Sequence, residues 1–131
     1  MITYYQNQPL EPQDVARVFD ASGIIRPSHN ITRIKRMFDG ANLIVSAWDE
    51  DKLIGVGRAL TDFSYCCYLS DLAVDTNYQG QGIGKHLINM VQEAIGEEVS
   101  LVLLSAAGVE DYYQHFGFSK ADNAFILKRR F

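Results

Sequence analysis

The chain has 131 residues, a length that suits one domain able to bury a core without disulfides or metal ions. Its hydrophobic content of 47% and charged content of 21% are ordinary for a globular protein and argue against disorder. A formal net charge of −4 argues against a general nucleic-acid surface, and no apolar run suits a transmembrane helix. We therefore expect a single domain over residues 1–131 with no nucleic-acid or membrane partner.

The cysteines, the histidines and the one basic cluster indicate no special chemistry. Cys66 and Cys67 are adjacent, which disfavours a disulfide within a strand and matches no zinc spacing. The three histidines are far apart in the sequence without a carboxylate cluster between them, so we expect no metal site. We interpret residues 128–130 as the solvated, basic end of a strand. Residues 1–5 lack the features of a signal peptide, and we expect a cytoplasmic protein.

The first half of the chain predicts a strand, two short helices and a hairpin. Gly23 is a suitable end for the first helix, and Asn30 is a suitable cap for the second. An acidic turn joins the two strands of the hairpin. The expected spans are 2–6 for the first strand, 11–22 and 31–39 for the helices, and 42–48 and 52–60 for the hairpin strands.

The centre of the chain predicts a strand, a glycine loop and a helix. The strand covers residues 64–74, and three glycines lead into a helix whose apolar face is formed by Ile83, Leu87, Met90, Val91 and Ala94. The first N–H groups of such a helix have no partner inside it, and the helix dipole adds partial positive charge. This junction therefore favours an anion, typically a phosphate.

Two common phosphate-binding motifs do not fit the glycine loop. The nucleotide P-loop needs four residues between its glycines, but Gly80 and Gly84 enclose three, and His86 stands where Ser or Thr is required. The dinucleotide fingerprint fits Gly80 and Gly82, but Lys85 stands in place of its third glycine. The glycine loop therefore belongs to neither of these two motifs.

The last third of the chain predicts a strand, a short helix and two further strands. Residues 99–105 are nearly all apolar, which is typical of a strand buried on both faces. Because a strand and a helix precede this segment, we expect a crossover that pairs it in parallel with the strand at 64–74. The remaining elements are expected at 110–115, 118–121 and 124–128.

Three segments resemble the GNAT acetyltransferase superfamily. Gln79-Gly80-Gln81-Gly82-Ile83-Gly84 resembles its Gln/Arg-x-x-Gly-x-Gly/Ala signature. Residues 71–75 are similar to the end of its fourth strand, and residues 112–118 to a later block. The resemblance implies an α/β protein of the GNAT acyl-CoA N-acyltransferase fold, with a mixed central sheet (β-α-α-β-β-β-α-β-α-β-β) and helices on both faces. The alternative is a glycine turn used only for packing.

The resemblance implies acetyl-CoA as cosubstrate, held mostly by main-chain groups in a gap between two diverging strands. Leu72, Ala73 and Val74 are the residues expected along the pantetheine arm. The pyrophosphate is expected to bind the main-chain amides of the glycine loop, which are those of Gln79, Gly80, Gln81, Gly82, Ile83, Gly84 and Lys85. Ala106 stands where many relatives carry an asparagine that contacts pantetheine, so that amide contact is not expected here.

Two residues are the candidates for acid–base chemistry. Tyr113 matches a family tyrosine that often protonates the coenzyme A sulfur, and a phenol with a pKa of about 10 holds its proton at neutral pH. The alternative is a tyrosine that packs in the core, and Tyr112 is a weaker candidate for the same role. Asp71 is the candidate base, acting directly or through water; alternatively, it braces a loop.

Arg26, Arg58 and Tyr68 are the candidates for the acceptor pocket. Arg26 belongs to the apolar connector at residues 24–27. This connector either packs in the core or borders the acceptor pocket, as the corresponding segment does in the family. In the pocket, Arg26 would bind an anionic group of the acceptor. Arg58 either lines the pocket or forms a structural ion pair. Tyr68 stands in the position of a strand-four glutamate found in some family members.

The resemblance predicts an N-acetyltransferase that moves an acetyl group from acetyl-CoA to a primary amine of a small molecule or peptide, by direct attack in a ternary complex. The competing hypothesis is a non-catalytic acyl-CoA binding or sensing module. A third hypothesis is nucleotide binding by the loop, for which ATP or NAD would compete with coenzyme A. Many relatives are dimers, so the resemblance is compatible with a homodimer, and the oligomeric state stays open at this point.

Overall fold

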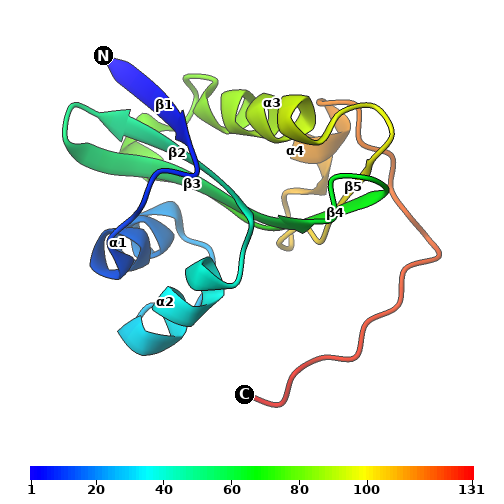
Figure 1. Ribbon diagram of the computed structural model, residues 1–131, viewed down its shortest axis with the longest axis horizontal. Helices are drawn as coiled ribbons and strands as arrows, with labels where there is room; N and C mark the ends of the chain where they lie inside the picture. Colours follow the sequence, from blue (N-terminus) through cyan, green and yellow to red (C-terminus); the bar gives the residue numbers. More distant parts are fainter.

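The computed structural model describes residues 1–131 and shows a mixed five-stranded sheet with helices on both faces (Figure 1). The sheet order is β1-β2-β3-β4-β5, and all pairs are antiparallel except β4 with β5. The strands are β1 Ile2–Gln6, β2 Leu43–Asp49, β3 Lys52–Thr61, β4 Cys66–Val74 and β5 Ser100–Leu103. The helices are α1 Pro12–Ser22, α2 Ile31–Asp39, α3 Ile83–Ile95 and α4 Glu110–Gln114, with a short 3-10 helix, η1, at Thr76–Tyr78. None of these helices is long and apolar enough to cross a membrane.

The predicted ends of α1 and α2 are confirmed. Gly23 ends α1 with a φ of 88°, and its N–H donates to main-chain oxygens in the last turn. Asn30 begins α2, where its side chain accepts a hydrogen bond from the Arg33 N–H at 3.1 Å. These two caps fix the length of the connector, which carries Arg26 from the end of α1 back toward the sheet.

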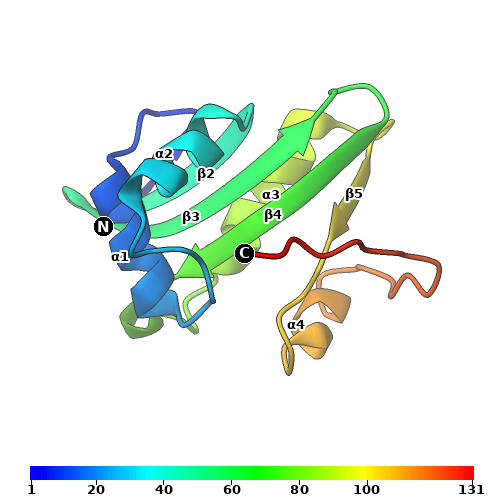
Figure 2. The ribbon, with the colours of Figure 1, turned by 90° about the horizontal axis from the view of Figure 1, so that it is seen from below.

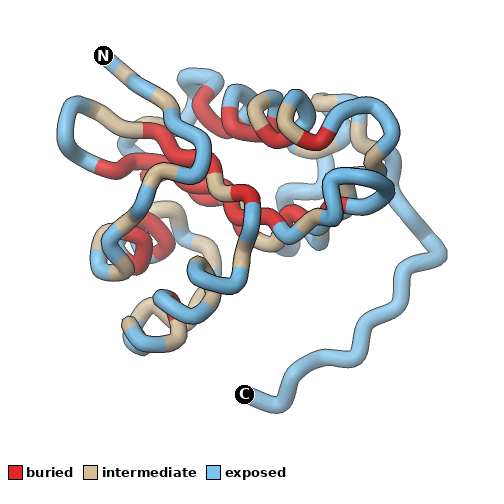
Figure 3. The backbone as a smooth tube through the Cα atoms, in the orientation of Figure 1, coloured by how far each residue is buried: buried red, intermediate tan, exposed pale blue.

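Buried side chains form one cluster on each face of the sheet (Figure 3). The cluster beneath α3 contains Leu43, Val45, Ala47, Ile54, Ala59, Cys67, Leu69, Ile83, Leu87, Ile88, Val91 and Ile95. The cluster beneath α1 and α2 contains Val15, Val18, Phe19, Ile34, Leu53, Val56 and Ala73. Full burial of one large apolar side chain contributes about 1.5–3 kcal/mol. Strands β3 and β4 are therefore held from both faces and form a stiff support for a site.

The parallel pairing of β4 with β5 is confirmed, as the crossover through α3 predicted. The expectation that this strand is buried on both faces is wrong, because Val102 and Leu104 are 49% and 52% exposed. The physical reason is position. β5 is the last strand of the sheet, and α1 and α2 lie over the opposite end (Figure 1).

The two strands expected at 118–121 and 124–128 do not form, and this prediction is wrong. Beyond Phe118 the chain runs on without pairing to the sheet, in orange and red in Figure 1. Phe125 and Leu127 are 96% and 101% exposed. A β-prone sequence becomes a strand only against a partner ladder and a half-buried face, and this tail has neither. The outer edge of β5 therefore stays unpaired.

Candidate active site

A gap opens between β4 and β5 (Figure 2). Their pairing ends at Leu69 and Leu103, and beyond this point β5 turns away toward α4. Residues 70–74 of β4 therefore have β3 on one side and no strand on the other. The last half of β4 therefore presents an open edge toward the gap.

The main-chain groups of Leu72 and Val74 face this gap. The Asp75 N–H donates to the carbonyl oxygen of Ile54 on β3 at 2.8 Å. Main-chain groups alternate in direction along a strand, so those of Leu72 and Val74 point away from β3. The Val74 carbonyl oxygen accepts a hydrogen bond from the side-chain amide of Gln79 at 3.0 Å, so it can be reached from the glycine loop.

The glycine loop joins η1 to α3. Gly80 and Gly82 have φ values of 82° and 81°, in the left-handed region where glycine alone is unstrained. Gly82 is the N-cap of α3, and no side chain bonds to the N–H groups of the first turn. The helix start is therefore open to an anionic ligand.

Gly84 has a different role in the same loop. A Cβ atom at this position would lie 2.1 Å from the hydroxyl oxygen of Tyr112. The missing side chain thus allows Tyr112 of α4 to place its hydroxyl against the first turn of α3. Burial raises the pKa of Tyr112. The sequence analysis ranked Tyr112 below Tyr113 as a candidate general acid, yet the Tyr112 hydroxyl is the one that reaches the glycine loop.

Tyr113 lies half-buried on α4, edge-on to the rings of Tyr112 and Phe118 at 5.2 Å and 5.7 Å between centroids. Burial raises the pKa of Tyr113, and the nearby charge of Arg26 partly opposes the rise. The phenol is therefore protonated at neutral pH. Tyr113 and Arg26 line the same cavity although they are far apart in the sequence.

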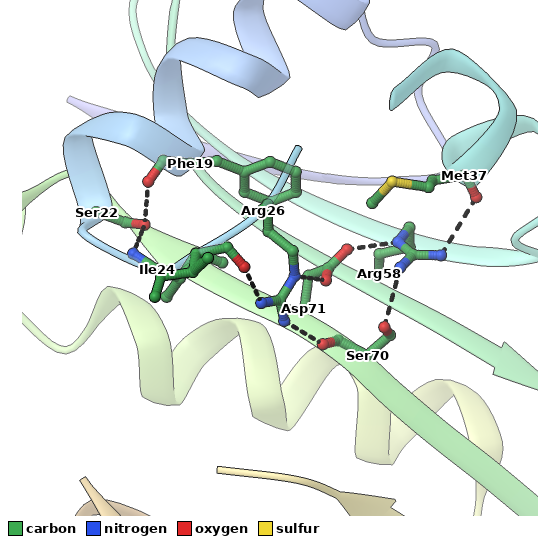
Figure 4. Close-up of polar contacts among 9 residues, drawn as sticks. Phe19, Ser22, Ile24, Arg26, Met37, Arg58, Ser70 and Asp71 are labelled. Carbon is green, nitrogen blue, oxygen red and sulfur yellow. Dashed lines mark hydrogen bonds and ion pairs between the residues drawn. The ribbon is translucent and has the colours of Figure 1, made fainter. Parts of the chain in front are cut away.

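Asp71 is held between two arginines on the α1 and α2 side of the sheet (Figure 4). Arg26 Nε donates to one carboxylate oxygen and Arg58 Nε to the other, each at 2.5 Å, and the Asp71 side chain is 0% exposed. Both arginines also bond to Ser70, through its carbonyl oxygen at 2.7 Å and its hydroxyl at 2.9 Å. Both oxygens of this carboxylate are occupied by guanidinium groups.

One cavity of about 1290 Å³ connects these parts. Every predicted site residue lines it except Asp71 and Gln81. The glycine loop and Tyr113 contribute to one part of the lining, and Arg26, Arg58 and Tyr68 to another. Sites for a single small molecule have volumes of roughly 300–1,000 Å³, so this cavity has room for two substrates.

Three basic residues that line the cavity were missed by the sequence analysis. Arg33 lies on the polar face of α2, which looks like any solvated helix face. Lys128 and Arg129 belong to the cluster interpreted as a solvated strand end. Both are exposed, but no strand forms there, and both line the cavity. The available signal was a basic cluster in a chain that is otherwise acidic.

Parallel strands that part beside a glycine loop at a helix start are the arrangement that the resemblance to acyl-CoA N-acyltransferases implied. The family model of the acetyltransferase (GNAT) domain matches residues 11–128, and the chain belongs to this family of acetyltransferases. The GCN5-related N-acetyltransferase 2, chloroplastic, of Arabidopsis thaliana is 39% identical over 71 residues, which is 53% of this chain and 28% of that protein. The histone acetyltransferase TAP1 of Glycine max is 35% identical over 75 residues, 53% of this chain and 31% of that protein. The chain thus spans about a third or less of these plant relatives.

Solved structures share the fold over nearly the whole chain. The protein SA2161 from meticillin-resistant Staphylococcus aureus matches with a TM-score of 0.84 and 23% identity, covering 98% of this chain and 100% of that one. The aminoglycoside N-acetyltransferase AAC(6')-Iy, solved in complex with CoA, matches with a TM-score of 0.75 and 14% identity, covering 99% and 95%. At these identities the likeness establishes the fold alone.

Proposed function

We propose that the protein transfers an acetyl group from acetyl-CoA to a primary amine of a small molecule or peptide, by direct attack in a ternary complex. The observation that carries the proposal is the cavity at the gap between β4 and β5, which joins the glycine loop to the arginines beyond β4. A cavity of this size holds the thioester and the amine together. Such a complex needs no covalent enzyme intermediate.

The residues around the gap offer hydrogen-bond partners for acetyl-CoA. When bound, acetyl-CoA would supply the thioester for the reaction. Main-chain amides from Gly80 to Lys85 offer donors for a pyrophosphate at an uncapped helix start, whereas the Gln79 N–H donates to the Thr76 carbonyl oxygen at 3.4 Å. Leu72 and Val74 offer strand-like main-chain partners for the pantetheine amides. Ala73 between them also lines the cavity, but its main-chain groups face β3. Ala106 also lines the cavity, with only a methyl group to contribute.

Tyr113 is the general acid in this proposal. The amine nitrogen attacks the thioester carbonyl carbon, the carbon–sulfur bond breaks, and the leaving sulfur takes the proton of the Tyr113 hydroxyl. The raised pKa of Tyr113 keeps that proton in place until the thiolate forms. The proton lost by the acceptor amine passes to solvent in the cavity, and the phenol regains a proton from solvent.

For Asp71 we propose a positioning role in place of the base. Its carboxylate does not line the cavity, and its two oxygens bind Arg26 and Arg58. A buried carboxylate shared by two guanidinium groups fixes both of them in one orientation. Asp71 thus acts on the acceptor through the arginines that it holds.

Two measurements on the purified chain test the proposed function. Calorimetry measures acetyl-CoA binding, and release of the CoA thiol is then followed across a panel of amines. We expect tight binding and amine-dependent release. Binding without release for any amine would favour the acyl-CoA binding module, and displacement of CoA by ATP or NAD would favour a nucleotide site. Absence of acetyl-CoA binding would remove the proposal altogether.

We propose the cytoplasm as the compartment. Cys66 and Cys67 are both free thiols, although Cys66 is exposed, and such thiols persist in reducing compartments. The Arabidopsis relative is described as chloroplastic, which makes a plastid the alternative. Imaging of a fluorescent fusion in the source cell distinguishes the two.

We also propose a homodimer. The outer edge of β5 is unpaired, and the neighbouring tail exposes Phe125 and Leu127 almost completely. Free strand edges and exposed apolar groups are typical of surfaces that meet another chain.

A further inference from the structure

The cavity gathers positive charge in a chain that is acidic overall. The chain contains 16 Asp and Glu residues and 12 Lys and Arg residues. None of the acidic residues lines the cavity, whereas the basic residues that line it are Arg26, Arg33, Arg58, Lys85, Lys128 and Arg129. A concave surface lined by one sign of charge concentrates ligands of the opposite sign.

The proposed cofactor site accounts for Lys85, which lies in the first turn of α3 beside the glycine loop. The three arginines come from elsewhere. Arg26 lies on the α1–α2 connector, Arg33 on α2 and Arg58 on β3. All three belong to the face of the sheet opposite α3, and Figure 4 shows Arg26 and Arg58. We call these three residues the acceptor arginines, because they lie across β4 from the loop.

The acceptor arginines keep unused donors and unbalanced charge. Arg26 and Arg58 share the single carboxylate of Asp71, so the three side chains together carry a net charge of +1. Arg26 and Arg58 each use three N–H donors on protein groups, fewer than a guanidinium possesses. Arg33 pairs with no Asp or Glu side chain, and its side chain donates one hydrogen bond, to the main-chain oxygen of Phe131 at 3.3 Å.

We infer that the acceptor is an amine that also carries a carboxylate or a phosphate group, an inference that rests on the proposed acetyl transfer. The anionic group is bound by the acceptor arginines, and the amine is directed to the gap beside Tyr113. Planar, charged donors of this kind match carboxylate and phosphate oxygens. Polycationic amines are disfavoured, because like charges brought together repel each other.

The same charges also help the nucleophile. Neighbouring cations favour the neutral form of an amine over its ammonium form. An acceptor in this cavity therefore loses its proton to solvent more readily, and no protein carboxylate is needed as base. This agrees with an Asp71 whose two oxygens are both occupied.

Matched pairs of amines test the inference. Thiol release from acetyl-CoA is measured with phosphoethanolamine against ethanolamine, with β-alanine against β-alaninamide, and with spermidine as the polycation. Within each pair we expect kcat/KM to be about tenfold or more higher for the anionic amine, which is the scale of a hydrogen bond to a charged group. The two pairs distinguish a phosphate from a carboxylate preference.

A variant pair ties the preference to the cavity. Arg33→Gln removes a cavity charge but leaves the Asp71 ion pairs in place, and we expect it to reduce the anionic preference about threefold or more. Arg36→Gln is the control, because Arg36 is exposed on the same helix and does not line the cavity. The control should keep the preference of the unchanged chain.

The outcomes separate this inference from the proposed function. Acetylation of spermidine, or of the two amines that lack an anionic group, at equal or higher kcat/KM overturns the inference and leaves acetyl transfer standing. Equal preferences in Arg33→Gln and Arg36→Gln, or no acetylation of either anionic amine, also overturn it. Failure of acetyl-CoA to bind in calorimetry is the separate result that removes the proposed function itself.

Discussion

Tyr112 and Tyr113 are neighbours on α4, but their hydroxyl groups have different surroundings. Tyr112 reaches Gly84, and Tyr113 lies half-buried within the influence of Arg26. The two phenols are therefore a natural pair for separating cofactor binding from proton transfer.

We predict that Tyr113→Phe lowers kcat about 100-fold or more, because the leaving sulfur loses its proton donor. Acetyl-CoA affinity should stay unchanged in calorimetry. In the unchanged chain, Tyr113 can act as an acid only while its hydroxyl is protonated. Because its pKa is raised above the ordinary tyrosine value of about 10, kcat should not fall through loss of this proton until the pH exceeds about 10. Tyr112→Phe is the matched control and should alter KM for acetyl-CoA more than kcat. A Tyr113→Phe enzyme with full kcat would contradict the assignment.

Asp71→Asn tests the positioning role through stability. The substitution leaves Arg58, 11% exposed, and Arg26, 26% exposed, without their shared counter-charge. Loss of one partner from a buried ion pair costs about 3–5 kcal/mol, and the partial exposure of Arg26 places this case at the low end. Urea unfolding should show a loss of about 3 kcal/mol.

The control for that loss is Asp75→Asn. Asp75 is buried just after the end of β4 and accepts only the Asn77 N–H, a bond that an asparagine side chain also accepts, so a loss below about 1 kcal/mol is expected. The pH dependence of kcat separates positioning from base catalysis in the Asp71 variant. Disappearance of the acid limb of the profile would restore Asp71 as the base, whereas an unchanged shape with a higher amine KM supports positioning.

At the scale of elements, the glycine loop is the part that a substitution can probe most cleanly. Gly82→Ala forces a side chain into a left-handed backbone with φ of 81°, and nothing crowds the site. The strain costs about 1–2 kcal/mol, and the loop can relieve it only by changing the direction of its amides. We predict weaker acetyl-CoA binding in calorimetry, about tenfold or more.

Gly96→Ala is the matched control, since Gly96 ends α3 with the same φ of 81° and is also uncrowded. It should lower the melting temperature at least as much but leave the cofactor affinity unchanged. Equal weakening of acetyl-CoA binding in both variants would show that the loop conformation is not what binds the cofactor.

Sequence patterns predicted those features of the fold that a few adjacent residues determine. Gly82 and Asn30 act within one turn of chain, so the loop and the helix caps could be predicted. The pairing of Arg26 with Asp71 joins residues 45 positions apart, and only the folded sheet shows that one carboxylate serves two arginines. Arg33 was missed because its helix face lies over a cavity that no local pattern marks.

The prediction of two strands in the C-terminal tail was wrong for a related reason. Residues 118–121 and 124–128 carry apolar, β-prone residues on either side of an Asp-Asn turn, but pairing depends on whether a sheet edge is within reach, which sequence alone does not tell. Here β5 pairs over four residues only, and the tail passes beside the cavity instead.

At the scale of the whole molecule, the unpaired edge of β5 predicts assembly. We expect light scattering to give a mass near twice the 14.8 kDa of one chain. Leu127→Asp should shift the mass toward the monomer, because a charge on an exposed apolar tail opposes its burial between chains. Lys120→Asp, another change on the exposed tail, is the control and should leave the mass as it is. A monomeric mass at every concentration would contradict the homodimer.

The gap between β4 and β5 can be approached from both faces of the sheet, since its lining comes from the glycine loop on one face and from the acceptor arginines on the other. Under the proposed function, each reactant then has an entrance of its own, and neither blocks the other's exit. Double-reciprocal plots should therefore intersect instead of running parallel. An unreactive analogue of the amine should inhibit competitively toward the amine and noncompetitively toward acetyl-CoA, as expected when arrival order is random. Uncompetitive inhibition toward acetyl-CoA would show instead that acetyl-CoA must bind first.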